Sequence, residues 1–146
     1  MKIKFFIIAV VLSLFTAVAF AEDELTTMAI QDAMDNPKVQ SSLYEDIALY
    51  WGSQGHPDVI KNFGEFKTSK RANKLGKSRE SACQWALASA VKALQQRARK
   101  EGGNAVINIR SNVLDNEVSS ETSYECLCGG MMVNVAVKGD VVKLAK

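Results

Sequence analysis

Catalytic residue types are scarce in this chain of 146 residues. It has one histidine, His56, and it contains neither a Gly-x-Ser-x-Gly elbow nor a His-Glu-x-x-His sequence. Its acidic residues are scattered, so no pair of carboxylates can be assigned to acid–base work. These absences exclude the commonest serine-hydrolase and zinc-protease sites. We assign no catalytic residue and no cofactor, and a non-enzymatic role is favoured over an enzymatic one.

A nucleotide-binding loop is also missing. Gly76-Lys77-Ser78 stands before a predicted helix and resembles the end of a P-loop, but that motif requires a glycine where Arg71 stands. The residues between them are not glycine-rich, and no strongly hydrophobic strand leads into them. We interpret Ser78 as a helix cap and Lys77 as a solvent-exposed side chain, which excludes a P-loop nucleotidase.

Neither sign of charge dominates. Lysine and arginine number 18 and aspartate and glutamate number 16, and two of the basic residues, Lys2 and Lys4, precede the first acid of the chain. Without this basic start the chain is electrically balanced. A balanced chain does not have the electrostatic footprint of a nucleic-acid binder, so we expect no nucleic-acid partner.

Only one long apolar run is present, from Phe5 to Phe20. It follows a basic start and ends at Ala19-Phe20-Ala21, which places small residues where a signal peptidase requires them. The run is shorter than the roughly 20 residues of a membrane-spanning helix. We predict that residues 1–21 are a signal peptide and that residues 22–146 form a single periplasmic or secreted domain without a transmembrane segment. The alternative is a retained N-terminal anchor.

The clearest structural signal is a helix from Arg79 to Glu101. Ser78 suits its N-cap, and Gly102 or Gly103 suits its C-terminal end. Apolar residues recur at spacings of three and four and make one stripe, namely Cys83, Ala86, Leu87, Ala90, Val91, Leu94 and Ala98.

Strands are predicted on both sides of this helix. β-branched and aromatic content places them at Ile47–Trp51, Phe63–Thr68, Ala105–Ile109 and Tyr124–Val137. A short helix is expected over Met28–Met34 and a helical turn at Val59–Lys61, and residues 22–27 are expected to be frayed. The predicted fold is therefore α+β, a small and mainly antiparallel sheet in the order β-β-α-β-β, with the long helix packed on it and a short N-terminal helix.

The last of these strands carries an internal phase change. Cys126 and Cys128 would face one side of an unbroken strand and Val133, Val135 and Val137 the other. Gly129-Gly130 lies between the two sets, and a bulge there is predicted to shift the phase.

Three cysteines in an exported chain suggest one disulfide and one free thiol. Cys126 and Cys128 would lie about 7 Å apart at Cα in a strand, which is the outer limit for a bridge. We therefore predict that Cys83 pairs with Cys126, with Cys128 as the alternative partner and three buried thiols as the remaining possibility. The loop that this bridge closes would restrict the denatured chain by about 4 kcal/mol.

A zinc site is the second hypothesis for the cysteines. Together with His56 they would make a set of three sulfurs and one nitrogen. The spacing is Cys-x-Cys, however, and not the usual Cys-x-x-Cys, and oxidation competes with metal binding. We assign no metal ligand, and His56 in its Gly55-His56-Pro57 turn remains a candidate ligand loop.

Basic residues gather between Lys61 and Arg79, where Glu65 is the only acid. Aromatic residues lie nearby in the sequence. This composition favours an anionic surface or an acidic envelope protein as partner, and the alternative is a solvated loop beside an edge strand. The candidate patch consists of Lys61, Lys67, Lys70, Arg71, Lys74 and Lys77.

Several short sequences carry a resemblance to a known family. They are Ala82-Cys83-Gln84-Trp85-Ala86, Lys100 to Ile109, Ser119 to Cys126 and Lys138 to Val142, supported by Gly55-His56-Pro57 and Phe63-Gly64-Glu65. With these the chain resembles small exported bacterial proteins that bear the inherited name "excinuclease ATPase subunit" or a variant that refers to the ABC excinuclease. The chain has no Walker motif and no zinc module, so neither excinuclease nor ATPase activity is expected.

A more distant resemblance rests on the helix that ends before Gly103-Asn104-Ala105-Val106. This arrangement is similar to YbjQ-type metal-binding domains and to RcsF-type envelope stress sensors. The resemblance implies a helix packed on a small sheet, and the RcsF type also implies disulfides in this region. We therefore expect a binding or interaction module of the cell envelope. The alternative is an oligomeric domain of the YbjQ type that binds a small ligand or a metal.

Overall fold

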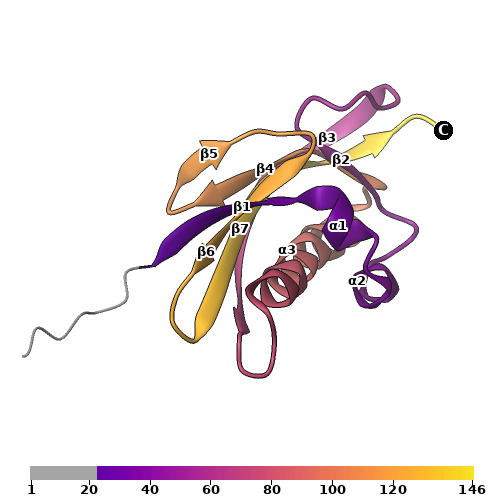
Figure 1. The fold of residues 1–146 in the computed structure, drawn as a ribbon. Coiled ribbons are helices and arrows are strands. Elements are labelled where there is room, and N and C mark those ends of the chain that lie inside the picture. The colour runs from indigo at the N-terminus through magenta and orange to yellow at the C-terminus, as the bar shows by residue number, and fades with distance from the viewer. Residues whose placement is uncertain (1–22) are drawn as a thin grey trace, which may run out of the picture.

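A computed structural model describes residues 23–146, and the predicted signal peptide lies outside them. The described chain is α+β, as predicted. A mixed sheet of 7 strands carries the long helix α3 (Arg79–Glu101) on one face (Figure 1). The strands are β1 (Glu24–Ala29), β2 (Ala48–Trp51), β3 (Val59–Asn73), β4 (Ala105–Val113), β5 (Asn116–Val118), β6 (Ser123–Cys128) and β7 (Met132–Leu144).

Helix α3 has the predicted bounds because its ends are fixed locally. The Ser78 side chain accepts a hydrogen bond from the amide of Ser81 at 3.0 Å and so caps the first turn. Gly102 ends the helix in the left-handed conformation, with φ of 87°. The apolar stripe between these caps is buried against the sheet, which supplies most of the stability of such a helix.

Strand β7 is the centre of the sheet. One edge pairs antiparallel with β3 from Met132 to Leu144, and the opposite edge is shared between two strands. The start of β7 pairs with β6, and the later part from Val137 to Val142 pairs with β4. Beyond these, β1 extends the sheet on β6, and β2 lies parallel to β4. This one parallel pair makes the sheet mixed.

The two faces of β7 divide the molecule into a core and an outer surface. Val133, Val135, Val137 and Val141 belong to the core together with the apolar face of α3. Because side chains alternate along a strand, the residues between them lie on the opposite, outer face of the sheet. These residues are Asn134, Ala136, Lys138 and Asp140.

The predicted strand from Tyr124 to Val137 is two strands. β6 and β7 form an antiparallel hairpin, and Gly129-Gly130 lies in the turn between them. The phase change between the cysteines and the valines therefore comes from a chain reversal and not from a bulge. The amide of Gly129 donates to the carbonyl of Met132 at 2.8 Å and closes this turn.

Other boundaries also differ from the sequence-based prediction. Val59–Lys61 is the start of strand β3 and not a helical turn, because it pairs with the end of β7. The N-terminal segment forms β1 on β6 and is followed by two short helices, α1 (Ile30–Met34) and α2 (Pro37–Ser42). Asn36 caps α2 by accepting from the amide of Lys38, so Asn36-Pro37 begins a helix as well as ending one. No helix within residues 23–146 is both long and apolar enough to cross a membrane.

Candidate functional site

The structure brings the three cysteines to one place between α3 and β6. Cys83 Sγ and Cys126 Sγ lie at a disulfide distance of 2.09 Å, and the two Cα atoms are 6.0 Å apart. This is the pairing that the sequence analysis preferred. Cys128, the alternative partner, is a buried free cysteine whose Sγ lies 3.6 Å from Cys83 Sγ.

His56 does not join the cysteines. The cluster of possible metal ligands found within residues 23–146 holds the three cysteines alone, so the four-ligand zinc set weighed from the sequence is not assembled. His56 is exposed, and its Nδ1 lies 2.8 Å from the carbonyl oxygen of Pro57. Its ring meets the Tyr50 ring edge-on, with centroids 5.6 Å apart. Both contacts are local to β2 and the loop that follows it.

The basic residues of the candidate patch are distributed over several surfaces. Lys61 lies at the start of β3, where its Nζ is 5.1 Å from the centre of the Phe63 ring. Lys70 pairs with Val135 and so shares the side of the sheet that carries α3. Lys74 and Lys77 lie in the turn between β3 and α3, where a backbone hydrogen bond of 2.9 Å joins them.

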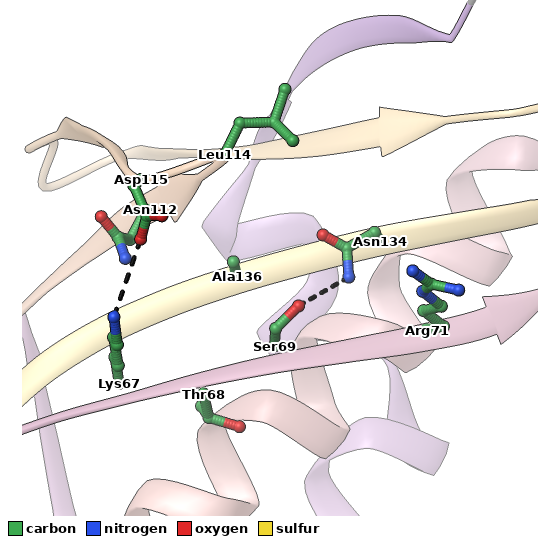
Figure 2. Close-up of a pocket in the computed structure, with 9 residues that line it drawn as sticks. All are labelled: Lys67, Thr68, Ser69, Arg71, Asn112, Leu114, Asp115, Asn134 and Ala136. Carbon is green, nitrogen blue, oxygen red and sulfur yellow. Dashed lines mark hydrogen bonds and ion pairs between the residues drawn. The ribbon is translucent and has the colours of Figure 1, made fainter.

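Lys67 and Arg71, by contrast, share the outer face of the sheet. They lie opposite Lys138 and Asn134 of β7. A hollow of about 470 Å³ opens above them, between β3, β7 and the β4–β5 hairpin (Figure 2). We call it the outer hollow, and its lining consists of Lys67, Thr68, Ser69, Arg71, Asn112, Leu114, Asp115, Asn134 and Ala136.

The floor of the outer hollow is held by one amide. Asn134 donates from Nδ2 to Ser69 Oγ at 2.8 Å and to the carbonyl of Lys70 at 3.2 Å. These bonds tie β7 to β3 and direct the Asn134 carbonyl oxygen away from Ser69 (Figure 2). The tip of the β4–β5 hairpin forms the wall, where Leu114 and Asp115 both have positive φ, as a tight hairpin turn requires.

Four charged residues elsewhere on the outer face form a network of ion pairs. Arg110, with its side chain 9% exposed, contacts both Glu65 and Glu117, and Lys138 contacts the same two carboxylates. The hydrogen bond from Arg110 holds the pKa of Glu65 below its ordinary value. Burial raises the pKa of the neighbouring Asp140. The ion pairs of Arg110 and Lys138 lie beside the part of β4 where its pairing with β7 shifts register, between Ile107 and Arg110. Because these four charges neutralise one another, they offer no free charge to a ligand.

Arg71 is different from these residues. Within residues 23–146, no carboxylate lies within 4 Å of its guanidinium, whereas Lys67 has Asp115 at 3.7 Å. Arg71 also lines a second hollow of about 440 Å³ that continues toward the β6–β7 turn and includes Asp23. Arg71 therefore lies where the two hollows adjoin. Among residues 23–146 its guanidinium has no ion-pair partner.

The two basic residues of the outer hollow, Lys67 and Arg71, belong to the patch predicted from the sequence, whereas its polar and apolar partners were not predicted. Asn134 stands in a valine-rich segment, where an isolated amide is a detectable signal. Leu114 and Asp115 lie between the predicted strands Ala105–Ile109 and Tyr124–Val137, where no helix or strand is predicted. Comparison of the chain with protein-family models, with curated proteins and with solved structures finds no match in any of the three.

Proposed function

We propose that the protein is an exported, non-catalytic binding module of the cell envelope, and that its binding site is the outer hollow. The observation that carries this proposal is the Arg71 guanidinium, which lies on a concave surface without an acidic partner among residues 23–146. An arginine in this situation gains most from a planar anion, because its fork of donors matches a carboxylate with two parallel hydrogen bonds.

The surroundings of Arg71 define the ligand further. The Asn134 carbonyl oxygen is an acceptor for an N–H group, and Leu114, with 74% of its surface exposed, supplies an apolar wall. A carboxylate, an N–H donor and an apolar side chain occur together in an acidic segment of a protein. We therefore propose an acidic segment of another envelope protein as the partner.

One feature supports placement in the envelope. The cysteine pair at disulfide distance is compatible with an oxidising compartment, where such bonds persist.

The basic run also has a role that requires no ligand. The long strand β3 pairs only with β7 among the described strands, and lysines along it discourage pairing with other chains. We therefore assign the binding role to Arg71 and not to the lysines of β3.

The proposal is tested with an immobilised polyglutamate peptide as the acidic probe. Wild-type protein is expected to be retained at low salt and released at ~0.15 M salt, where the Debye length is about 8 Å. Arg71→Glu is expected to abolish retention. Lys38→Glu is the matched control, because it makes the same change of charge at an exposed residue of α2, on the helical side of the sheet (Figure 1). Equal retention of the two variants, or no retention of wild-type protein at low salt, would contradict the proposal.

A further inference from the structure

The three cysteine sulfurs form a single compact cluster. All three Sγ atoms lie within 4.8 Å of one another, and Cys128 Sγ is 3.6 Å from Cys83 Sγ and 3.9 Å from Cys126 Sγ. All three residues are buried, with at most 3% of their surface exposed. They come from two different elements, α3 and β6, so the fold itself gathers them.

The spacing of these sulfurs suits a shared ligand. An ion held by thiolates at about 2.3 Å, the usual Zn–S distance, keeps its sulfur ligands about 3.4 Å apart in a pyramidal arrangement and about 3.8–4.0 Å apart in a tetrahedral or planar one. The two separations made by Cys128 fall close to this range without movement of the backbone. Once the Cys83–Cys126 bond is reduced, the sulfurs of these two residues can move apart to a separation in the same range.

The cluster offers three sulfurs and no fourth ligand. No histidine or carboxylate of residues 23–146 joins it, and a structural zinc ion almost always takes four ligands. The Thr26 hydroxyl oxygen lies 3.8 Å from the Cys128 sulfur. The surrounding residues belong to the hydrophobic core. An ion bound here must therefore accept three sulfurs and must leave little net charge, because charge is costly to bury.

Charge then selects the ion. Three thiolates with a monovalent ion leave a net charge of two negative units, and with a divalent ion they leave one. Only a trivalent ion gives a neutral complex. We propose that the reduced protein binds one trivalent thiophilic ion between Cys83, Cys126 and Cys128, with arsenite as its accessible form. This site is distinct from the outer hollow and does not depend on it.

The chemistry balances in two steps. A dithiol donor of the envelope reduces the Cys83–Cys126 bond, giving up two electrons and two protons and closing to its own disulfide. Arsenous acid, As(OH)₃, then exchanges its three hydroxyl groups for three cysteine sulfurs, and the three thiol protons leave with them as three water molecules. No electron moves in this second step, and neutral reactants give a neutral complex. The disulfide therefore gates the site, which exists only in the reduced protein.

The test uses mature protein reduced with a phosphine, freed of the reductant without oxygen, and titrated with arsenite. We expect one arsenic per chain by native mass spectrometry, with the loss of three hydrogens, and three sulfur neighbours at the arsenic X-ray absorption edge. Cys128→Ala retains the disulfide pair but lacks the third sulfur. Its reduced form is expected to bind on the order of a hundredfold more weakly, because the third ligand acts at high effective concentration. Oxidised wild-type protein is expected to bind no arsenic.

Circular dichroism of the reduced protein separates binding from unfolding. A reduced protein that keeps its fold, or regains it on addition of arsenite, supports a site built by the fold. Two sulfurs and one oxygen around arsenic in the wild-type protein would overturn the proposal. Equal affinities of wild-type protein and Cys128→Ala would overturn it too, as would an unfolded reduced protein that arsenite does not restore.

Discussion

Gln95 holds the segment before β2 onto helix α3, and replacing it should destabilise the protein strongly. Its side chain is buried, with 1% of its surface exposed. Its Nε2 donates to the carbonyls of Tyr44 and Ile47, each at 2.9 Å, and its Oε1 accepts from the amide of Tyr44 at 2.9 Å. One side chain thus satisfies three backbone groups that lie outside any helix or strand.

The magnitude of the effect follows from these contacts. Gln95→Leu preserves the approximate volume but leaves three backbone groups without their partner. A typical hydrogen bond contributes about 1 kcal/mol, and a buried group left unpaired costs about 1–3 kcal/mol. The segment lies near the surface, so water can reach part of it, and leucine gains some apolar burial. We therefore expect a loss of about 2–4 kcal/mol in the free energy of unfolding.

Urea denaturation followed by circular dichroism measures this loss. Gln96→Leu is the matched control, because Gln96 is exposed and makes one long contact, 3.3 Å to the Tyr44 hydroxyl. The control should change stability by less than about 0.5 kcal/mol. The assigned role of Gln95 is refuted if the two variants differ by less than about 1 kcal/mol, the contribution of one hydrogen bond.

Three further predictions concern the sheet. Gly103→Ala places a methyl group 2.7 Å from the carbonyl oxygen of Val142 and should cost about 1–3 kcal/mol in urea denaturation, whereas Gly55→Ala meets nothing within 4 Å and should be neutral. Glu65→Gln should cost under about 1 kcal/mol at neutral pH, since Glu65 is half exposed. Because Arg110 lowers the Glu65 pKa, this cost should shrink as the pH falls below 4.5. A cost that does not change with pH would count against this ion pair. Burial raises the Asp140 pKa, so Asp140→Asn should raise the melting temperature at pH 7, and this gain should vanish below pH 3.8, where aspartate is protonated in both states. A lower melting temperature of the variant at pH 7 would contradict this assignment.

Helix α3 was predictable because its determinants are local. The cap at Ser78, the glycine at position 102 and the apolar stripe between them all lie within one stretch of the sequence. The strand segments were harder, because pairing between distant residues decides their limits. Val59 is extended because it meets Leu144, and nothing near Val59 in the sequence indicates this.

The outer hollow was predictable only in part. The alternation of side chains places Lys67 and Arg71 on one face of β3, which the sequence contains. Their neighbours Asn134 and Asp115 reach the same place through the register of β7 and the turn between β4 and β5, and both depend on the tertiary fold. The cysteine cluster was closer to prediction, because an apolar helix face and a strand of the same core must meet.

The position of β7 in the sheet has a consequence for biogenesis. β3, β4 and β6 all pair with β7, and all three precede it in the chain. The sheet therefore cannot close until β7 has been synthesised, and folding must wait for contacts between residues far apart in the sequence. Under the export proposed above, such a delay would keep the chain unfolded until its last strand is available. It also leaves the cysteine thiols accessible to oxidants before the core encloses them, so the order of strands sets the time at which a disulfide can form.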